Sequence, residues 1–175
     1  MQFPLPFVPK QSYKHGNGFG GSREKVRAGL MHAANDLRAP SGTPVLALED
    51  GYVLAGPYEF FRTTYAIEIQ HKSFIARYCE ISKNTEVTKD DEVREGQIIG
   101  YVGNQPGNDM LHIEFYSGDA VGPLTVKPNP PYDRRSDVFD GASYLDEAAR
   151  DAALKSAPSN YAIITDDEGK KFFNL

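Results

Sequence analysis

Two of the four histidines in this 175-residue chain lie close to carboxylates, at spacings that could hold a metal ion. His32 precedes Asp36 by four residues, and His112 precedes Glu114 by two. Met110–Tyr116 is expected to be a strand, in which alternate residues share a face. Two imidazoles and one carboxylate form a recurrent zinc-ligand set, and three protein ligands leave a fourth position for water. These residues are candidate ligands, although a His-x-x-x-Asp pair is common and a strand histidine is more often hydrogen-bonded and half-buried.

The elements that must position these residues are expected to be short strands. Sixteen Gly and twelve Pro residues divide most of the chain into short β-rich runs. An Asp-Gly pair is a strong hairpin signal, so Thr43–Leu54 is expected to form two strands around a turn at 49–51. The other expected strands are Thr64–Gln70, Phe74–Ser82, Gln97–Val102 and Met110–Tyr116. This pattern predicts a mainly β fold, built as a small antiparallel sheet, sandwich or partly open barrel.

The last third of the chain has a different character. Residues 121–135 are proline-rich and are expected to form an ordered excursion over the surface. Ser143–Lys155 has the pattern of a C-terminal helix, with Ser143 as its N-cap. Tyr161–Leu175 is expected to form a terminal hairpin around 167–169. The chain therefore divides into an N-terminal extension (1–18), a β domain (19–120) and a C-terminal part (121–175) packed on that domain.

The composition argues against several classes of protein. Nineteen Lys and Arg against 24 Asp and Glu give a net charge of -5, and no basic stripe is present, so no nucleic-acid partner is expected. The apolar stretches fall far short of the roughly 20 residues that span a bilayer, so no membrane span is expected. A single cysteine excludes an intrachain disulfide. Residues 1–10 lack the pattern of a Sec signal, so synthesis in the cytoplasm without that signal is expected.

The candidate ligands belong to a longer pattern. His32-x-x-x-Asp36 is followed at once by Leu-Arg-Ala-Pro-Ser-Gly-Thr-Pro-Val. Residues 93–103 read Val-x-x-Gly-Gln-x-Ile-Gly-x-Val-Gly, and His112 lies in Leu-His-x-Glu. In order and spacing, over residues 19–116, this pattern resembles the zinc peptidases of the lysostaphin and LytM type.

The resemblance implies a fold, a cofactor and an activity. The implied fold is a lysostaphin-like antiparallel β domain of the duplicated hybrid motif type. The implied cofactor is one Zn²⁺ ion per chain, held by the residues at the motif positions, His32, Asp36 and His112. The implied activity is cleavage of peptide bonds in bacterial peptidoglycan, by water that the metal activates at neutral pH.

The sequence departs from the family at two further histidines. The family's Tyr-x-His-Leu strand reads Tyr78-Cys-Glu80-Ile here, and the first His of His-x-His is Met110. The domain could therefore be degenerate and bind without cutting, or be an active variant in which Glu80 is the general base and then the acid. Glutamate is a usual base in zinc hydrolases, and all three ligands are kept, which favours the active variant. In it, Met110 packs beside the site, and the metal stabilises the oxyanion together with Tyr78 or Arg77, unless both side chains are plain strand surface.

Several other residues have a functional and a structural interpretation. Glu114 could orient a metal ligand from behind it or be a solvated strand carboxylate. His15, in the glycine-rich loop at 14–22, could cover the zinc-binding groove that the resemblance implies or supply a fourth ligand in a resting state, or be a mobile surface histidine. Arg134 could meet carboxylates of the substrate or be surface charge. His71 is expected to be structural, and Cys79 to be a small core residue on the strand face opposite its neighbours.

Motifs around Arg77–Glu80, Met110–Glu114 and Arg134–Asp137 also resemble a branch of the family associated with secreted antibacterial effectors, notably of the type VI secretion system. That resemblance implies peptidoglycan as substrate, with secretion machinery and a cognate immunity protein as partners. It also implies action in the periplasm or cell wall after delivery. The expected function is a zinc-dependent peptidoglycan endopeptidase. The alternatives are an N-acetylmuramoyl-L-alanine amidase with the same zinc site, an inactive wall-binding or regulatory module, and a hydrolase of some other amide.

Overall fold

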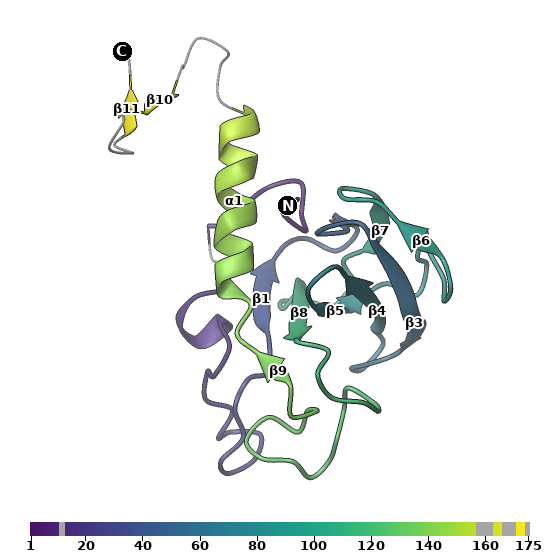
Figure 1. Ribbon diagram of the computed structural model, residues 1–175. Helices are drawn as coiled ribbons and strands as arrows, with labels where there is room; N and C mark the ends of the chain where they lie inside the picture. The colour runs from purple at the N-terminus through teal and green to yellow at the C-terminus, as the bar shows by residue number, and fades with distance from the viewer. Residues whose placement is uncertain (11–12, 157–162, 166–170, 174–175) are drawn as a thin grey trace.

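The computed structural model describes residues 1–10, 13–156, 163–165 and 171–173 (Figure 1). Its main element is a seven-stranded sheet in the order β1-β8-β5-β4-β3-β6, with β9 also paired to β8. All its pairings are antiparallel. The strands are β1 (Asn35–Arg38), β3 (Gly51–Glu59), β4 (Tyr65–His71), β5 (Ile75–Ile81), β6 (Glu92–Val93), β8 (Met110–Tyr116) and β9 (Val138–Phe139). A second sheet pairs β2 (Pro44–Leu46) with β7 (Ile98–Tyr101).

The two faces of the main sheet differ in chemistry. Strand alternation sends Tyr78 of β5 and its cross-strand partner Ile113 of β8 into the apolar core. The next pairs along the ladder, Arg77 with Glu114 and Cys79 with His112, point to the opposite face. That face is polar and yet buried, so other segments must cover it. The polar face is where the candidate ligands lie.

The proline-rich excursion supplies part of that cover. Residues 121–135 are tied to themselves and to the sheet, with Arg135 N–H donating to the Leu124 carbonyl and an isolated bridge joining Thr125 and Arg134. Arg77 on β5 donates to the Thr125 hydroxyl at 2.9 Å. The excursion thus lies over the polar face, as an ordered segment.

Helix α1 (Ala142–Ser156) packs on the core side (Figure 1). Its buried residues are Leu145 and Ala148, and the Tyr144 ring lies 4.8 Å from the ring of Phe74 and 6.1 Å from that of Phe115. The approach is close because Gly141 precedes the helix: a Cβ there would lie 2.0 Å from the Phe115 ring. The expected mainly antiparallel β fold with a C-terminal helix is confirmed.

Two local predictions are wrong. Thr43–Leu54 contains two strands but no hairpin, because β2 pairs with β7 and β3 pairs with β4 and β6. Ser143 is not the N-cap, because the helix already begins at Ala142, whose N–H donates to the Asp140 carboxylate. In the terminal segment, β10 (Ile163–Thr165) and β11 (Lys171–Phe173) pair antiparallel as predicted, and the turn at 167–169 lies outside the described residues.

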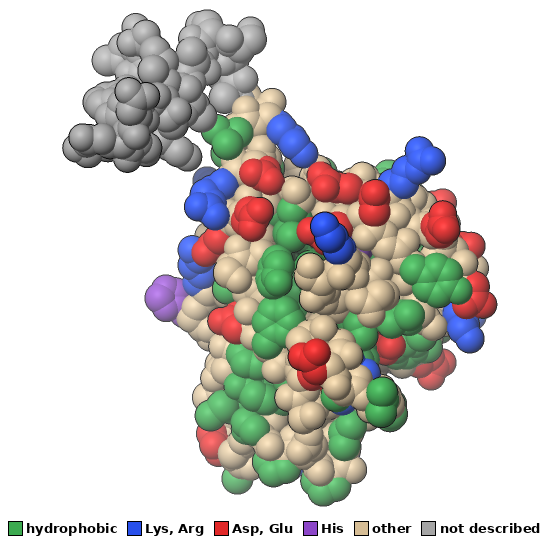
Figure 2. Space-filling view, viewed as in Figure 1, with side chains coloured by type: hydrophobic (Ala, Val, Ile, Leu, Met, Phe, Trp, Pro, Cys, Tyr) green, Lys and Arg blue, Asp and Glu red, His purple; other side chains and the backbone are tan. Residues whose placement is uncertain are grey.

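The surface charge and the length of the helix bear on two expectations from composition, that the protein has no nucleic-acid partner and no membrane span. In the face shown in Figure 2, positive and negative side chains are interspersed and form no continuous basic band. Among the described residues, no helix has the length and apolar character needed to cross a membrane.

Candidate metal centre

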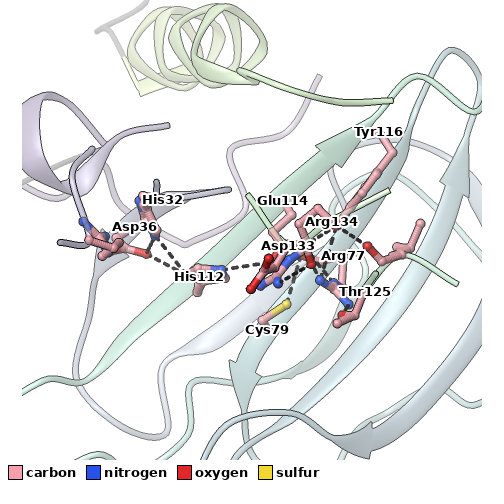
Figure 3. A network of polar contacts seen from close by, with 12 residues as sticks. His32, Asp36, Arg77, Cys79, His112, Glu114, Tyr116, Thr125, Asp133 and Arg134 are labelled. Carbon is pink, nitrogen blue, oxygen red and sulfur yellow. Dashed lines mark hydrogen bonds and ion pairs between the residues drawn. The ribbon is translucent and has the colours of Figure 1, made fainter. Parts of the chain in front are cut away.

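Three side chains converge where β1 meets β8 (Figure 3). Asp36 on β1 and His112 on β8 are directly paired across the ladder, and His32 comes from the segment just before β1. Nε2 of His32 lies 3.2 Å from Oδ1 of Asp36 and 3.3 Å from Nδ1 of His112, and this Nδ1 lies 3.0 Å from the same Oδ1. All three side chains are buried. The structure thus brings together the three candidate ligands.

Two segments, the glycine-rich loop and the proline-rich excursion, hold the backbone around His32 by hydrogen bonds. The His32 N–H donates to the Gly21 carbonyl and the Gly20 N–H donates to the His32 carbonyl, both at 2.8 Å. The Met31 N–H donates to the carbonyl of Pro131 in the excursion, also at 2.8 Å. The glycine-rich loop and the excursion therefore fix His32, which no strand holds.

Each imidazole has its second nitrogen occupied outside the cluster. Nδ1 of His32 lies 3.0 Å from the Gly18 carbonyl oxygen, and Nε2 of His112 lies 3.1 Å from Oε1 of Glu114. A nitrogen facing such an acceptor carries a proton, so in the neutral form of each ring the other nitrogen presents its lone pair to the cluster. This is the tautomer that a metal ligand needs.

The cluster fits a tetrahedral divalent ion. With bonds of about 2.0–2.1 Å, zinc holds its ligand atoms about 3.3 Å apart, close to the separations here. Burial alone would raise the pKa of Asp36 and lower that of His112. Their mutual hydrogen bond outweighs burial, together with the His32 and Glu114 contacts, so the pKa of Asp36 lies well below its usual range and that of His112 rises to about 9. Without a metal, a proton on His112 balances the carboxylates, and an ion would replace it.

Behind His112, a buried carboxylate is shared by several donors. Glu114 is fully buried and accepts hydrogen bonds from Arg77, from Tyr116 and, at 2.9 Å, from Nε of Arg134 (Figure 3). Burial would raise the pKa of Glu114, but Arg77 and the other donors hold it well below its usual value. The side chain that fixes His112 is therefore itself fixed and ionised.

Glu80 reaches the polar face through a break in the strand register. Tyr65 pairs with Ile81 and Ala66 with Cys79, so Glu80 is an extra residue of β5, a β-bulge. Its φ is 62°, a left-handed conformation that is costly for a side chain with a Cβ. Burial raises the pKa of Glu80, although His112 and a hydrogen bond from Gln105 act in the opposite direction. A buried carboxyl group with a raised pKa thus lines the same pocket as the three ligands.

The pocket over the cluster has a volume of about 550 Å³. Aromatic side chains and basic groups form much of its wall, and the ligands and Glu80 lie among its lining residues. The ring of Phe60 lies 5.7 Å from that of His112 and 5.2 Å from the guanidinium carbon of Arg77. Tyr58, Phe60 and Phe61, an aromatic run in and after β3, line the pocket wall. The pocket is large enough for several residues of an extended peptide.

One expected catalytic residue is in the wrong place. Tyr78 is fully buried on the core face, where its hydroxyl accepts from the Leu48 N–H and donates to Nε2 of His71, both at 3.0 Å. It does not line the pocket, so a role for Tyr78 at the oxyanion is contradicted. The reason is the bulge: alternation would place Tyr78 and Glu80 on one face, and the extra residue separates them.

The remaining candidates occupy several different places. Met110 and Arg134 line the pocket, and Arg77 lines it with its donors turned to Glu114 and Thr125. His15 is exposed and lies outside the pocket lining, which argues against a fourth-ligand role in this structure. His71 is buried against Tyr78, in agreement with a structural role, and Cys79 is buried on the polar face beside His112, not in the apolar core.

The sequence-based prediction missed Gln105. This residue lies in the loop before β8, is 2 % exposed, and donates to the Glu80 carboxylate. The only sequence signal is its place in the Gly- and Asn-rich loop between two expected strands, which does not single it out.

Comparison with known families agrees with this geometry. The model described as peptidase family M23 matches residues 30–123, more than half of the chain and all three candidate ligands. The chain belongs to peptidase family M23. Two curated relatives of this M23 chain are a peptidoglycan DD-endopeptidase of Vibrio cholerae, ShyC, 31% identical over 99 residues, and an uncharacterized metalloprotease of Haemophilus influenzae, 33% identical over 100 residues. The match covers 55% of the M23 chain in each case, but only 23% and 21% of the two relatives.

Solved structures support the M23 fold. Lysostaphin superposes with a TM-score of 0.61 at 20% identity, covering 98% of this chain and 66% of lysostaphin. LytU superposes with a TM-score of 0.60 at 20% identity, covering 84% of this chain and 93% of LytU. The expected membership of the lysostaphin and LytM type of peptidase is confirmed at the level of family and fold.

Proposed function

We propose that this M23 chain is a zinc-dependent peptidoglycan endopeptidase. The observation that carries the proposal is the convergence of His32, Asp36 and His112 atoms at 3.0–3.3 Å, in a pocket that also contains Glu80. Support for the substrate comes from the relative whose name describes a peptidoglycan DD-endopeptidase. The chain spans less than a quarter of that relative, so the substrate is part of the proposal.

The proposed chemistry assigns one task to each group. His32, Asp36 and His112 hold the ion, which when bound supplies a Lewis acid that polarises the scissile carbonyl and makes water nucleophilic near neutral pH. Glu80 takes a proton from the attacking water on a carboxylate oxygen. It then delivers that proton to the nitrogen of the leaving amine as the C–N bond breaks. The new C–O bond and the protonated amine balance the reaction.

The other polar groups of the pocket position rather than react. Glu114 fixes the ring of His112, and Arg77 and Arg134 are engaged by Glu114. Arg134 is in addition a pocket residue that could meet a carboxylate of the substrate. Met110 packs in the wall and leaves the proton transfer to Glu80.

Digestion of purified sacculi tests the proposal. Zinc-loaded protein is expected to convert cross-linked muropeptides into uncross-linked ones, detected by mass spectrometry, and a chelator is expected to stop the reaction. His112→Ala should lose the metal and the activity. Glu80→Gln should keep about one zinc ion per chain and lose activity by a factor of about 10²–10⁴. Glu92→Gln, an exposed carboxylate on β6, is the matched control and should behave as wild type.

The same digestion separates the alternatives. Release of intact stem peptides from the sugar would identify an amidase, for which neither curated relative named above gives support. Sacculi that bind zinc-loaded protein without being cut would identify a binding module, and the endopeptidase proposal would then be rejected. The type VI delivery route and a cognate immunity protein remain predictions from the sequence resemblance.

A further inference from the structure

Glu80 is held by one loop at two points. The loop between β7 and β8 donates the Gly103 N–H to the Glu80 carbonyl at 2.8 Å and the Gln105 Nε2 amide to Oε2 of Glu80 at 2.5 Å. Both bonds lie at the bulge, where β5 has left its ladder with β8 and Ile81 forms a bridge to Val102. The unusual backbone of Glu80 and its carboxylate are therefore fixed by the same segment.

Gln105 is built into that loop firmly. Its side chain is 2 % exposed, and its backbone N–H donates to the Asp109 carboxylate at 2.6 Å. Its carbonyl accepts from the Asn108 N–H at 2.7 Å. Asp109 also accepts from the Ser41 N–H at 3.3 Å, which ties the loop to the segment after β1. Gln105 is not among the residues that line the pocket, so it contacts Glu80 from outside that lining.

One amide atom of Gln105 is unusual. Its Oε1 is buried and has no hydrogen-bond partner among the described residues. A buried acceptor without a partner carries a free-energy cost, which is tolerated where function requires it. The carboxamide offers a donor to the ionised form of Glu80, and after rotation it would offer this acceptor to the protonated form. A neutral amide can thus hydrogen-bond to Glu80 both before and after Glu80 takes up a proton, without adding a charge.

We propose that Gln105 is a positioning residue for Glu80, which holds the carboxylate in the pocket and serves both of its protonation states. The proposal rests on the proposed function, since it assigns Gln105 to the proton transfer of that reaction. The charged groups that act most strongly on the Glu80 carboxylate are His112, Asp36 and His32. If Gln105 were replaced by an apolar residue, none of these groups could take over its hydrogen bond to Glu80, because they are engaged with one another at the cluster.

The test is Gln105→Met, which keeps the length of the side chain and removes both polar atoms. In metal-free protein labelled with ¹³C in its glutamate carboxyl groups, NMR titration should give a higher pKa for Glu80 than in wild type, with the resonance assigned by Glu80→Gln. In zinc-loaded protein, the acid limb of sacculus digestion should move upward by about half a pH unit, which is a roughly threefold loss on the steep part of that limb and a smaller loss on the plateau above it. Zinc content should stay at the wild-type value, and the protein should remain folded.

Two controls keep the outcomes distinct. Asn104→Ala removes an exposed amide from the same loop and should leave both titrations unchanged. If Gln105→Met does not fold, Gln105→Glu keeps the shape, and its shared proton should raise the pKa of Glu80 further. An unchanged Glu80 titration and an unchanged acid limb would overturn the proposal, and so would a loss of activity that follows a loss of zinc. If wild-type protein cuts no sacculi, the proposed function fails, while the NMR titration still decides whether Gln105 positions Glu80.

Discussion

Nε2 of His112 lies 3.1 Å from Oε1 of Glu114, two residues further along β8. We expect Glu114→Gln to weaken zinc binding by about tenfold or more, because the amide offers a single acceptor for which the neighbouring guanidinium groups compete. Competition with a chromophoric chelator measures the affinity, and circular dichroism checks the fold. Glu92→Gln is the matched control. An affinity equal to that of wild type would show that Glu114 does not orient the ring.

Arg77 is 2 % exposed and pairs with Glu114, which predicts a large effect on stability. Arg77→Met takes away one of the two guanidinium groups that bind the buried Glu114 carboxylate, so it should lower the free energy of unfolding by about 3 kcal/mol. Arg77→Lys keeps the charge but loses the two-pronged contact, so its loss should be smaller. Urea unfolding of metal-free protein measures both, with exposed Arg94→Met as the reference. Equal losses for the Met and Lys variants would contradict the role of charge.

His71 makes the fold sensitive to acid. Burial lowers its pKa to about 4 in the folded protein, against about 6.5 in an unfolded chain. Between these pH values His71 is protonated in the unfolded chain and neutral in the folded protein. The stability that depends on keeping His71 neutral, on the order of 3 kcal/mol of unfolding free energy, is therefore present above about pH 6.5 and lost as the pH falls toward about 4. We expect His71→Asn to flatten the dependence of the unfolding free energy on pH across this window. Exposed His15→Asn should keep the wild-type slope, and a wild-type slope in His71→Asn would rule out this source.

Gly103 should tolerate no side chain. A Cβ there would lie 2.8 Å from the Glu80 carbonyl oxygen and 3.0 Å from that of Ile81, both backbone atoms. Gly103→Ala is therefore expected to lower the free energy of unfolding by about 2 kcal/mol and to displace Glu80. Gly16→Ala, where nothing lies within 4 Å, should change it by less than about 0.5 kcal/mol. Thermal unfolding compares the two, and equal midpoints would exclude the close contact.

Local patterns predicted the strands well where the pairing is local. β4 and β5 are neighbours in sequence and in the sheet, and their alternating residues are visible in the chain. The predicted hairpin at 43–54 failed because β2 pairs with β7, about fifty residues away, and no local signal carries a long-range pairing. The helix was placed within one residue at each end, but its first turn uses Asp140 rather than Ser143.

The site was predictable to the extent that motifs encode it. His32, Asp36 and His112 could be named from the family pattern, and the structure places their atoms together. Tyr78, one of the two residues expected at the oxyanion, lies on the core face, although regular alternation would place it on the same face as Glu80. The bulge at Glu80 breaks that alternation, and the Glu80 carbonyl accepts a hydrogen bond from the Gly103 N–H in a distant loop. The contact of Gln105 with Glu80 could not be predicted either, because it exists only in the folded protein, where that loop packs against β5.

The cluster also connects distant parts of the chain. His32 and His112 are 80 residues apart, and β1 through β7 lie between them. An ion held by both would act as a crosslink closing that long loop, in a chain whose single cysteine cannot form an intrachain disulfide. Removing the ion would therefore do more than stop a reaction. The segment before β1 would then depend on its backbone hydrogen bonds to the glycine-rich loop and the excursion, and the protein would begin to open from that edge of the sheet.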